Sequence, residues 1–344
     1  MFYSDPLRHM PPGDLIQLHW VAEFLDYEAF FSWLPNKMPL VLTLHDMANF
    51  TGGCCYDMGC GRFAQECGAC PQLGSGDESD LTRQIWRRKQ KYYASLNPDR
   101  VMIVTPSRWL GAEVSRSPLL SRFPRSVIPY GLDLEVFQPR DRRVAREVLG
   151  IPLETRVLLF IAAGIHEPRK GFALLCRALD GIESHSRMLL LCVGAGASTE
   201  FPRCPCTHID GVTDDRFLSF IYSAADVLVA PALADNLPNT ILESIACGTP
   251  VVALTAGGVP DAVRPDVTGL LATPGDAAEL RDAILGLLNN DVKRAEMSRK
   301  CRQVAVAEYE LGVQARRYLK LYEKLLPADS ESLMSQPAVQ RVNP

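Results

Sequence analysis

Two carboxylates eight positions apart, Asp235 and Glu243, lie in the stretch ADNLPNTILESIACGTPVV (234–252). An apolar run typical of a buried strand precedes this stretch, and a helix begins within it. Backbone amides at a helix start attract anions such as phosphate, whereas a carboxylate there would accept hydrogen bonds from sugar hydroxyls beside the phosphate. Glu243 is therefore a candidate for binding a ribose, with the amides of Thr240 and Ile241 facing a diphosphate.

The same residues also have a purely structural explanation. Thr240-Ile-Leu-Glu243 matches a capping box, in which Thr240 is the N-cap of the helix and Glu243 bonds back to it. This explanation leaves Asp235 and the Asn-Leu-Pro-Asn turn that ends at Asn239 without a role. On the sequence alone, both explanations of Glu243 stay open.

Two cations precede another predicted helix. Arg169 and Lys170 follow the apolar run RVLLFIAAG (156–164) and stand where a helical pattern starts. Cations at that end oppose the helix dipole by about 0.3–1 kcal/mol each, which favours a bound anion, and a pair of exposed surface cations is the alternative. Gly257 and Gly258 follow a further strand pattern, where paired glycines permit close approach to a ligand or form a simple turn.

Two histidines in the first half of the chain end apolar strand patterns. His19 ends the run LIQLH, and His45 ends PLVLTLH and precedes Asp46. A lone histidine in such a place is usually structural, but two at successive strand ends, one beside a carboxylate, favour a functional site. We expect His19, His45 and Asp46 to face a cleft from the domain opposite the two carboxylates.

The glycine-bearing stretch TGGCCYDMGCGRFAQECGACPQLGSGD (51–77), which we call the Cys-rich segment, holds five of the eleven cysteines. Cys67 and Cys70 form a Cys-x-x-Cys pair, and together with Cys60 and either Cys54 or Cys55 they could make a tetrahedral structural zinc site. Two disulfides are the competing explanation, which a reducing cytosol disfavours. In either case we interpret the segment as a structural staple.

The composition limits the class of protein. A length of 344 residues suggests two domains, and a hydrophobic content of 47% fits a globular protein with real cores. The net charge of -4 gives no general basic field for nucleic acid. No apolar run approaches the roughly 20 residues that span a membrane, and the N-terminus lacks the order of a signal peptide. We therefore expect a cytoplasmic protein, compatible with peripheral contact at the cytoplasmic membrane.

Short runs rich in Val, Ile and Leu alternate with helical patterns, which predicts an α/β architecture of parallel sheets covered on both faces. Ligands of such sheets bind beyond the carboxyl ends of the strands, where all the candidate residues stand. We divide the chain into an N-terminal domain (1–130), a linker (131–143), a C-terminal domain (144–307), a helix expected to return to the N-terminal domain (308–327), and a disordered tail (328–344).

Three segments carry a resemblance to a known family: DVLVAPALADNLPNTILESIACGTPVVALTAGGVPDAV, PLVLTLHDMANFTGGCCYDMGCGRFAQECGACPQLGS and VTPSRWL…VIPYGLD. They resemble glycosyltransferase family 4 and, within it, bacterial exopolysaccharide enzymes of the colanic-acid type. The resemblance implies the GT-B fold, in which two doubly wound Rossmann-like domains face a cleft. It also implies retaining transfer, without a catalytic metal or other cofactor, from a UDP- or GDP-sugar to a glycan or lipid-linked acceptor.

The resemblance also implies roles for individual residues. Glu243 matches the second glutamate of the family's E-x7-E motif, which would hold the ribose, and Asp235 replaces the first, which would contact the donor sugar. Arg169 and Lys170 match the basic pair on the diphosphate. His45 matches a histidine near the reacting sugar. The other donor-side candidates are Asn239, Thr240, Ile241, Gly257 and Gly258.

The chain departs from the family pattern in two places. Tyr130 stands where the linker usually has an asparagine, and the strand and glycine-rich loop that usually open the family are missing before the LIQLHW run. The second departure predicts an incomplete N-terminal domain. It leaves one alternative to a transferase, a truncated, non-catalytic nucleotide-sugar-binding protein. A GT-B sugar-nucleotide epimerase is a further alternative.

Overall fold

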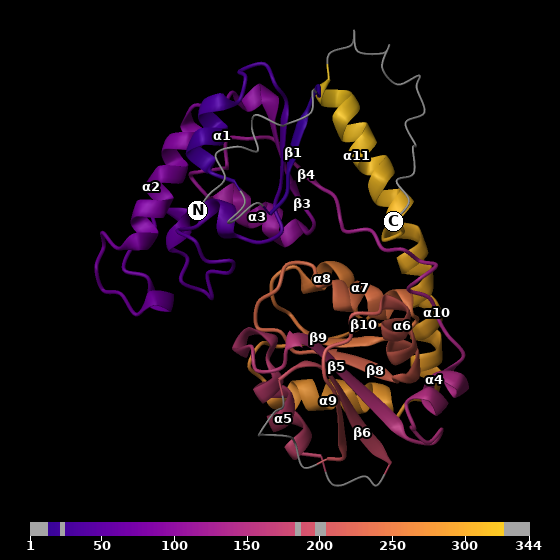
Figure 1. The fold of residues 1–344 in the computed structure, drawn as a ribbon. Helices are drawn as coiled ribbons and strands as arrows, with labels where there is room; N and C mark the ends of the chain where they lie inside the picture. The colour runs from indigo at the N-terminus through magenta and orange to yellow at the C-terminus, as the bar shows by residue number, and fades with distance from the viewer. Residues whose placement is uncertain (1–12, 21–24, 183–186, 197–203, 327–344) are drawn as a thin grey trace.

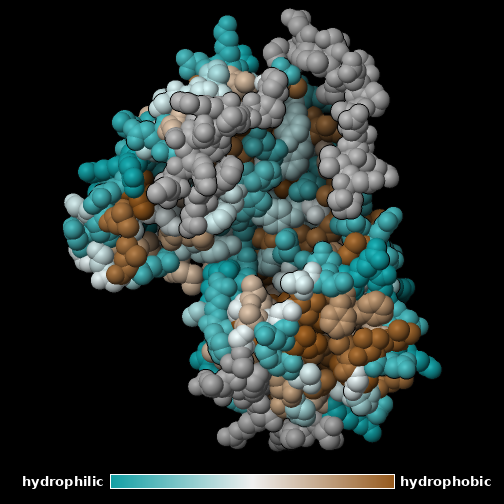
Figure 2. Space-filling view, in the orientation of Figure 1, coloured by the Kyte–Doolittle hydropathy of each residue, from teal (hydrophilic) through white to brown (hydrophobic). Residues whose placement is uncertain are grey.

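The computed structural model describes residues 13–20, 25–182, 187–196 and 204–326, so the predicted disordered tail (328–344) lies outside the described residues. Two separate parallel sheets organise the chain (Figure 1). In the space-filling view the molecule forms two lobes with a narrower waist between them (Figure 2). Within the described ranges, no helix combines the length and the apolar character needed to cross a membrane.

The N-terminal sheet has four parallel strands in the order β1-β2-β3-β4. Strand β2 is buried along its whole length because both faces of the sheet are covered. Leu40 and Leu42 point into a core that α1, α2 and α3 cover, whereas Val41 points to the other face. The elements are β1 (Ile16–Leu18), α1 (Tyr27–Trp33), β2 (Leu40–Thr43), α2 (Leu81–Ala94), β3 (Val101–Thr105), α3 (Arg108–Arg116) and β4 (Arg125–Val127).

The last described helix, α11 (Leu311–Leu325), covers that other face of the N-terminal sheet. Leu321 is buried against Val41 and Val104, and the hydroxyl of Tyr318 lies 3.3 Å from that of Thr43. In Figure 1, α10 runs along the C-terminal domain and α11, in yellow, along the N-terminal one. The chain therefore crosses between the domains twice, once after β4 and once between α10 and α11.

The C-terminal sheet has six parallel strands in the order β10-β9-β8-β5-β6-β7. Its strands are β5 (Arg156–Gly164), β6 (Met188–Ala195), β7 (Cys206–Ile209), β8 (Val227–Ala230), β9 (Val251–Leu254) and β10 (Gly269–Ala272). Its helices are α4 (Arg142–Val148), α5 (Phe172–Asp180), α6 (Asp215–Ala224), α7 (Asn239–Ala246), α8 (Val259–Ala262), α9 (Ala277–Leu288) and α10 (Asp291–Glu308).

Two hydrophobic cores flank the C-terminal sheet. One contains the buried faces of α6 and α7, and the other contains those of α5 and α9. Alternate residues of β5 point to opposite cores: Val157 and Leu159 to the first, Leu158 and Phe160 to the second. This arrangement confirms the predicted α/β class with two parallel sheets covered on both faces, while the numerical domain limits stay predictions.

One buried carboxylate joins several elements of the C-terminal domain. Asp226 accepts hydrogen bonds from Arg142 at 2.5 Å, from Arg146 at 3.0 Å and from the amide of Val157 at 2.7 Å. The side chains of Asp226 and Arg146 are fully buried. A buried charge without its partner is strongly destabilising, so loss of this ion pair would lower the stability of the domain.

We predict that Asp226→Ala lowers the free energy of unfolding by about 3–5 kcal/mol, because Arg146 would stay buried without a counter-charge. Urea titration followed by circular dichroism measures the change. Glu296→Ala is the matched control, because Glu296 pairs with Lys300 on the surface of α10 and its loss should leave the stability unchanged. Equal effects of the two substitutions would contradict the role of Asp226.

Candidate active site

The predicted site residues come from loops at the carboxyl ends of strands in both sheets. His19 follows β1 and His45 follows β2, whereas Lys170 follows β5 and Asp235 follows β8. Hydrogen bonds connect the two groups of loops across the domains. Asn236 Nδ2 donates to the carbonyl oxygen of His45 at 2.8 Å. The two halves of the predicted site therefore face each other.

The Asp235 carboxylate lies at the centre of this arrangement, with only 11% of its side chain exposed. Its Oδ2 accepts hydrogen bonds from Lys170 Nζ at 2.7 Å and from Arg169 at 3.2 Å. Its Oδ1 accepts from its neighbour's amide, that of Asn236, at 3.0 Å and from the hydroxyl of Tyr56 at 3.2 Å. The three predicted residues Arg169, Lys170 and Asp235 thus form one ionic cluster.

The two cations are positioned by a short 3-10 turn, Pro168–Lys170, and not by the start of α5. Gly171 separates this turn from the helix, with a positive φ of 75° and with Pro231 O only 1.9 Å from where a Cβ would lie. The two cations therefore stand just before a helix, as predicted, but in a turn of their own and not in the helix itself. Lys170 is held by the carboxylate of Asp235. Arg169 is held by Asp235 together with Glu167, at 2.7 Å, and the carbonyl oxygen of Ala234, at 2.8 Å.

Glu243 does not belong to a capping box. Helix α7 begins at Asn239, and its N-cap is Pro238, which has no side chain to bond an amide. Thr240 thus lies inside the first turn, and the capping explanation was wrong. Glu243 is partly buried, and its Oε2 accepts a hydrogen bond from the hydroxyl of Tyr222 at 2.7 Å.

The amides at the start of α7 are only partly available. Ile241 N donates to the carbonyl oxygen of Pro238 at 3.1 Å, so the expectation that this amide is free was wrong. A narrow cavity beside this turn is lined by Lys170, Asp235, Thr240 and Ile241. It measures about 20 Å³, far less than the roughly 300–1,000 Å³ of ordinary ligand pockets.

The paired glycines support the Asp235 loop. A Cβ on Gly257 would lie 1.9 Å from Asp235 O, and one on Gly258 would lie 1.8 Å from Asn236 O. Gly258 N also donates to Asp235 O at 3.0 Å. The close backbone approach that the sequence indicated is made to this loop of the protein itself.

On the N-terminal side, His45 joins a row of three rings. Its Nε2 lies 3.0 Å from His19 Nδ1, and its Nδ1 lies 2.8 Å from the hydroxyl of Tyr130, whose ring stacks on it at an interplanar angle of 11°. Burial and the neighbouring His19 lower the pKa of His45, and burial lowers that of His19. Asp46 Oδ1 accepts the amide of Ala48 at 2.7 Å, so this carboxylate forms a local turn.

Sequence reasoning missed four residues of this site. Tyr56, Tyr130, Tyr222 and Asn236 each bond a predicted residue through a contact that the spacing of residues does not indicate. Asn236 also accepts the hydroxyl of Ser107 at 2.5 Å, across the two domains. Tyr130 was visible as a departure from the family pattern, and the stack on His45 now accounts for it.

The four cysteines predicted to bind zinc, Cys54, Cys60, Cys67 and Cys70, are free thiols. No group of three or more His, Cys, Asp or Glu side chains in the described part of the chain is arranged to hold a metal ion. Cys67 Sγ instead accepts the amide of Gly52 at 3.1 Å. These cysteines form no disulfide in the described part of the chain, and the zinc site stays a prediction.

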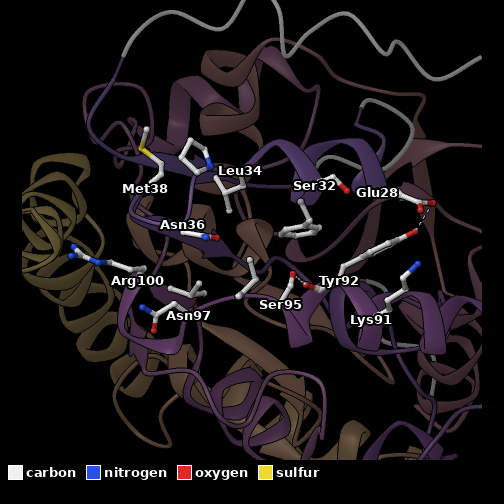
Figure 3. A pocket seen from close by; sticks show the side chains of 14 residues that line it. Glu28, Ser32, Leu34, Asn36, Met38, Lys91, Tyr92, Ser95, Asn97 and Arg100 are labelled. Atoms are coloured by element: carbon white, nitrogen blue, oxygen red, sulfur yellow. Dashed lines mark hydrogen bonds between the residues drawn. The ribbon is translucent and has the colours of Figure 1, made fainter.

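Two larger pockets lie in the N-terminal domain. One, of about 490 Å³, opens at the carboxyl ends of β1 and β2 and is lined by Trp20, Tyr27, Asn49, Ile85 and Arg88, among others. The other, of about 380 Å³, lies at the amino ends of β2 and β3, where Lys91, Asn97 and Arg100 surround it (Figure 3). None of the predicted site residues lines either pocket. The first pocket lies at the same end of the sheet as His19 and His45, whereas the second lies at the opposite end.

Comparisons with known proteins agree with this geometry. The profile of the family described as "Glycosyl transferases group 1" matches residues 155–290. The chain is 36% identical over 336 residues to the D-inositol 3-phosphate glycosyltransferase of Saccharomonospora viridis, covering 88% of this chain and 70% of that protein. It is 33% identical over 179 residues to the protein of the same name from Mycobacterium tuberculosis (strain ATCC 25177 / H37Ra), covering 47% of this chain and 35% of that protein.

Solved structures show the same fold. Sucrose-phosphate synthase from Thermosynechococcus elongatus matches with a TM-score of 0.70 at 22% identity, covering 91% of this chain and 73% of that one. Anabaena HepE in complex with UDP-glucose matches with a TM-score of 0.63 at 18% identity, covering 90% and 78%. The chain therefore belongs to the group 1 glycosyltransferases, has the GT-B fold, and is a transferase. Among the predicted details, the colanic-acid subgroup and the shortened N-terminus find no support in these comparisons.

The burial of Glu243 generates a prediction about pH. Burial raises the pKa of Glu243 above its usual 4.5. The carboxyl group of Glu243 therefore ionises at a lower pH in the unfolded chain than in the folded protein. Stability is therefore lost as the pH rises from about 4.5 through the raised pKa. We predict that Glu243→Gln, which can still accept from Tyr222, gains stability relative to the natural protein between about pH 4 and pH 7.

Urea unfolding of both proteins at about pH 4 and at about pH 7 measures this stability difference. Glu154→Gln is the control, because Glu154 is exposed and its replacement should have the same effect at both pH values. A stability difference between Glu243→Gln and the natural protein that stays constant or falls with rising pH would contradict the claim that burial raises the pKa of Glu243.

Proposed function

We propose that this glycosyltransferase moves a sugar from a nucleotide diphosphate donor to an acceptor hydroxyl with retention of configuration. The observation that carries the proposal is the ionic cluster of Arg169, Lys170 and Asp235 beside the start of α7. It stands at the carboxyl ends of β5 and β8, where open α/β sheets bind their ligands. Two cations next to helix-terminal amides suit a diphosphate.

The proposed chemistry follows from where charge develops. As the sugar leaves, negative charge builds on the phosphate oxygens, and Lys170 and Arg169 would stabilise it without a metal. The anomeric carbon becomes oxocarbenium-like. No protein nucleophile is assigned, so the acceptor would attack from the face that the phosphate leaves, and a phosphate oxygen would take the acceptor's proton.

The remaining site residues would orient the donor. Glu243, held by Tyr222, would accept hydrogen bonds from the ribose, and Asp235 would contact the donor sugar once the diphosphate takes its cations. His45 would lie near the reacting sugar. The lowered pKa of His45 favours the neutral ring, which can both donate and accept a hydrogen bond. The complex of HepE with UDP-glucose supports a UDP-sugar as the first donor to test.

The acceptor would enter from the N-terminal domain. The 490 Å³ pocket there combines the apolar Trp20 and Ile85 with the cationic Arg88. The relatives' name, D-inositol 3-phosphate glycosyltransferase, supports a phosphorylated polyol as one acceptor class. The resemblance to exopolysaccharide enzymes supports a glycan or a lipid-linked glycan as the other, and a lipid-linked acceptor would bring the protein to the inner membrane face.

We predict that the purified protein transfers sugar from one of a panel of UDP- and GDP-sugars to D-inositol 3-phosphate or to a lipid-linked glycan, measured by nucleotide release and product mass. Lys170→Ala should lower kcat by about 10²-fold or more, because it removes one stabilising charge from the leaving phosphate. Glu243→Ala should abolish transfer while the protein stays folded.

The control is Lys320→Ala, which removes an exposed cation of α11 and should leave the rate unchanged. Absence of transfer and of nucleotide release with every donor would contradict the proposed function. Full activity of Lys170→Ala or Glu243→Ala would contradict the assignment of that residue. Retention is tested separately, by comparing the anomeric configuration of donor and product.

A further inference from the structure

The Cys-rich segment has a place in the structure that neither zinc nor disulfides explain. It lies between β2 and α2 in the chain. Part of it reaches the C-terminal domain, because the hydroxyl of Tyr56 donates to Asp235 Oδ1 at 3.2 Å. This is a direct contact between the segment and the ionic cluster of the candidate site.

The segment is held in shape by buried groups and by ion pairs. Phe63 packs in the N-terminal core, and Lys89 donates to the carbonyl oxygen of Thr51 at 2.9 Å. Arg83 pairs with Glu66 at 2.6 Å, with both side chains mostly enclosed. The start and the middle of the segment are thus fixed to α2 and to the core.

Tyr56 itself is fixed on two sides. Gln72 Nε2 donates to the carbonyl oxygen of Tyr56 at 2.8 Å, within the same segment. The ring of Tyr56 stacks on Trp109 of α3, with ring centroids 6.3 Å apart and an interplanar angle of 20°. The N-terminal domain therefore presents this side chain in a defined orientation toward the other domain.

The Tyr56 ring also contacts a cation of the donor site. The guanidinium carbon of Arg169 lies 4.8 Å from the ring centroid, within the range of a cation–π interaction. Tyr56 therefore contacts the ionic cluster in two separate ways: its ring covers Arg169, and its hydroxyl donates a hydrogen bond to Asp235. Burial and the Asp235 carboxylate raise the pKa of Tyr56, so the hydroxyl stays protonated and donates.

We propose that Tyr56 is a positioning residue of the donor site. The Cys-rich segment of the N-terminal domain places its side chain against the C-terminal domain. The proposal rests on the proposed function, because it assumes that a diphosphate binds at Arg169 and Lys170. The ring keeps Arg169 beside the diphosphate and covers it from water. The hydroxyl orients Asp235 toward the donor sugar. The Cys-rich segment thus serves as a structural arm whose purpose is to place Tyr56.

The two contacts predict two separable effects. Tyr56→Phe keeps the ring over Arg169 but removes the bond to Asp235, so nucleotide affinity should change by less than about twofold while kcat falls about tenfold. Tyr56→Leu removes both contacts, so it should also weaken the binding of UDP or GDP by about tenfold. A merely structural role would not separate nucleotide affinity from kcat in this way.

Isothermal calorimetry with UDP and with GDP, together with kcat and KM for the active donor, tests the proposal on the full chain. Tyr322→Phe is the matched control, because Tyr322 lies on α11 and bonds Gln17 outside the site, so neither quantity should change. Thermal unfolding of each variant shows whether it is folded. If Tyr56→Leu does not fold, Tyr56→Phe still tests the hydroxyl through the split between kcat and affinity.

The outcomes separate this inference from the proposed function. If the natural protein binds neither UDP nor GDP, the proposed function fails and this inference fails with it. If the natural protein binds nucleotide and Lys170→Ala does not, but a folded Tyr56→Leu binds as well as the natural protein, only the role of Tyr56 is overturned. An unchanged kcat in Tyr56→Phe overturns the role of the hydroxyl.

Discussion

The charge of Asp235 is the feature on which the candidate site depends. A carboxylate with 11% of its side chain exposed needs partners, because a buried charge without them is strongly destabilising. Asp235 finds them in Lys170 and Arg169 of its own domain and in Tyr56 of the other. The same pairing that stabilises the carboxylate also occupies the two cations that would bind a diphosphate. Donor binding would then be an exchange of one anion for another.

The loop that carries Asp235 also joins the domains through neutral groups. Asn236 bonds the backbone of His45 and the side chain of Ser107, both in the N-terminal domain. Gly257 and Gly258 lie so close to this loop that a side chain on either would collide with its carbonyl oxygens. Movement of Asp235 toward a donor would therefore also disturb the hydrogen bonds of the neighbouring Asn236 to the N-terminal domain.

Much of the fold was predictable from the sequence because local patterns determine it. Short apolar runs predicted parallel strands, and the rule that ligands lie beyond carboxyl ends of strands selected Lys170, Asp235 and His45 as neighbours. The local details were less reliable. Helix α7 begins at Asn239 with Pro238 as its N-cap, so Thr240 cannot act as the cap, and Gly171 separates the turn of the two cations from α5. Each of these errors placed a helix start two or three residues away from its actual position.

The missed residues share a physical reason. Tyr56 and Tyr222 act through contacts with residues outside their own segments, and no local pattern distinguishes them from other tyrosines. Tyr130 stood out only as a departure from the family pattern, which did not indicate its contact with His45. The Cys-rich segment drew attention through its cysteines, whereas its contact with the site is made by the tyrosine between them. Only the three-dimensional arrangement connects Tyr56 with a cation and a carboxylate more than a hundred residues away.

The central claim is that Asp235 occupies the cations that bind the donor's diphosphate, and the affinity of Asp235→Asn for UDP tests it most directly. Calorimetry should show that this variant binds UDP more tightly than the natural protein, by about tenfold or 1.4 kcal/mol, while transfer falls because the donor sugar loses its carboxylate. Unchanged or weaker binding of UDP by a folded Asp235→Asn would contradict the exchange of anions.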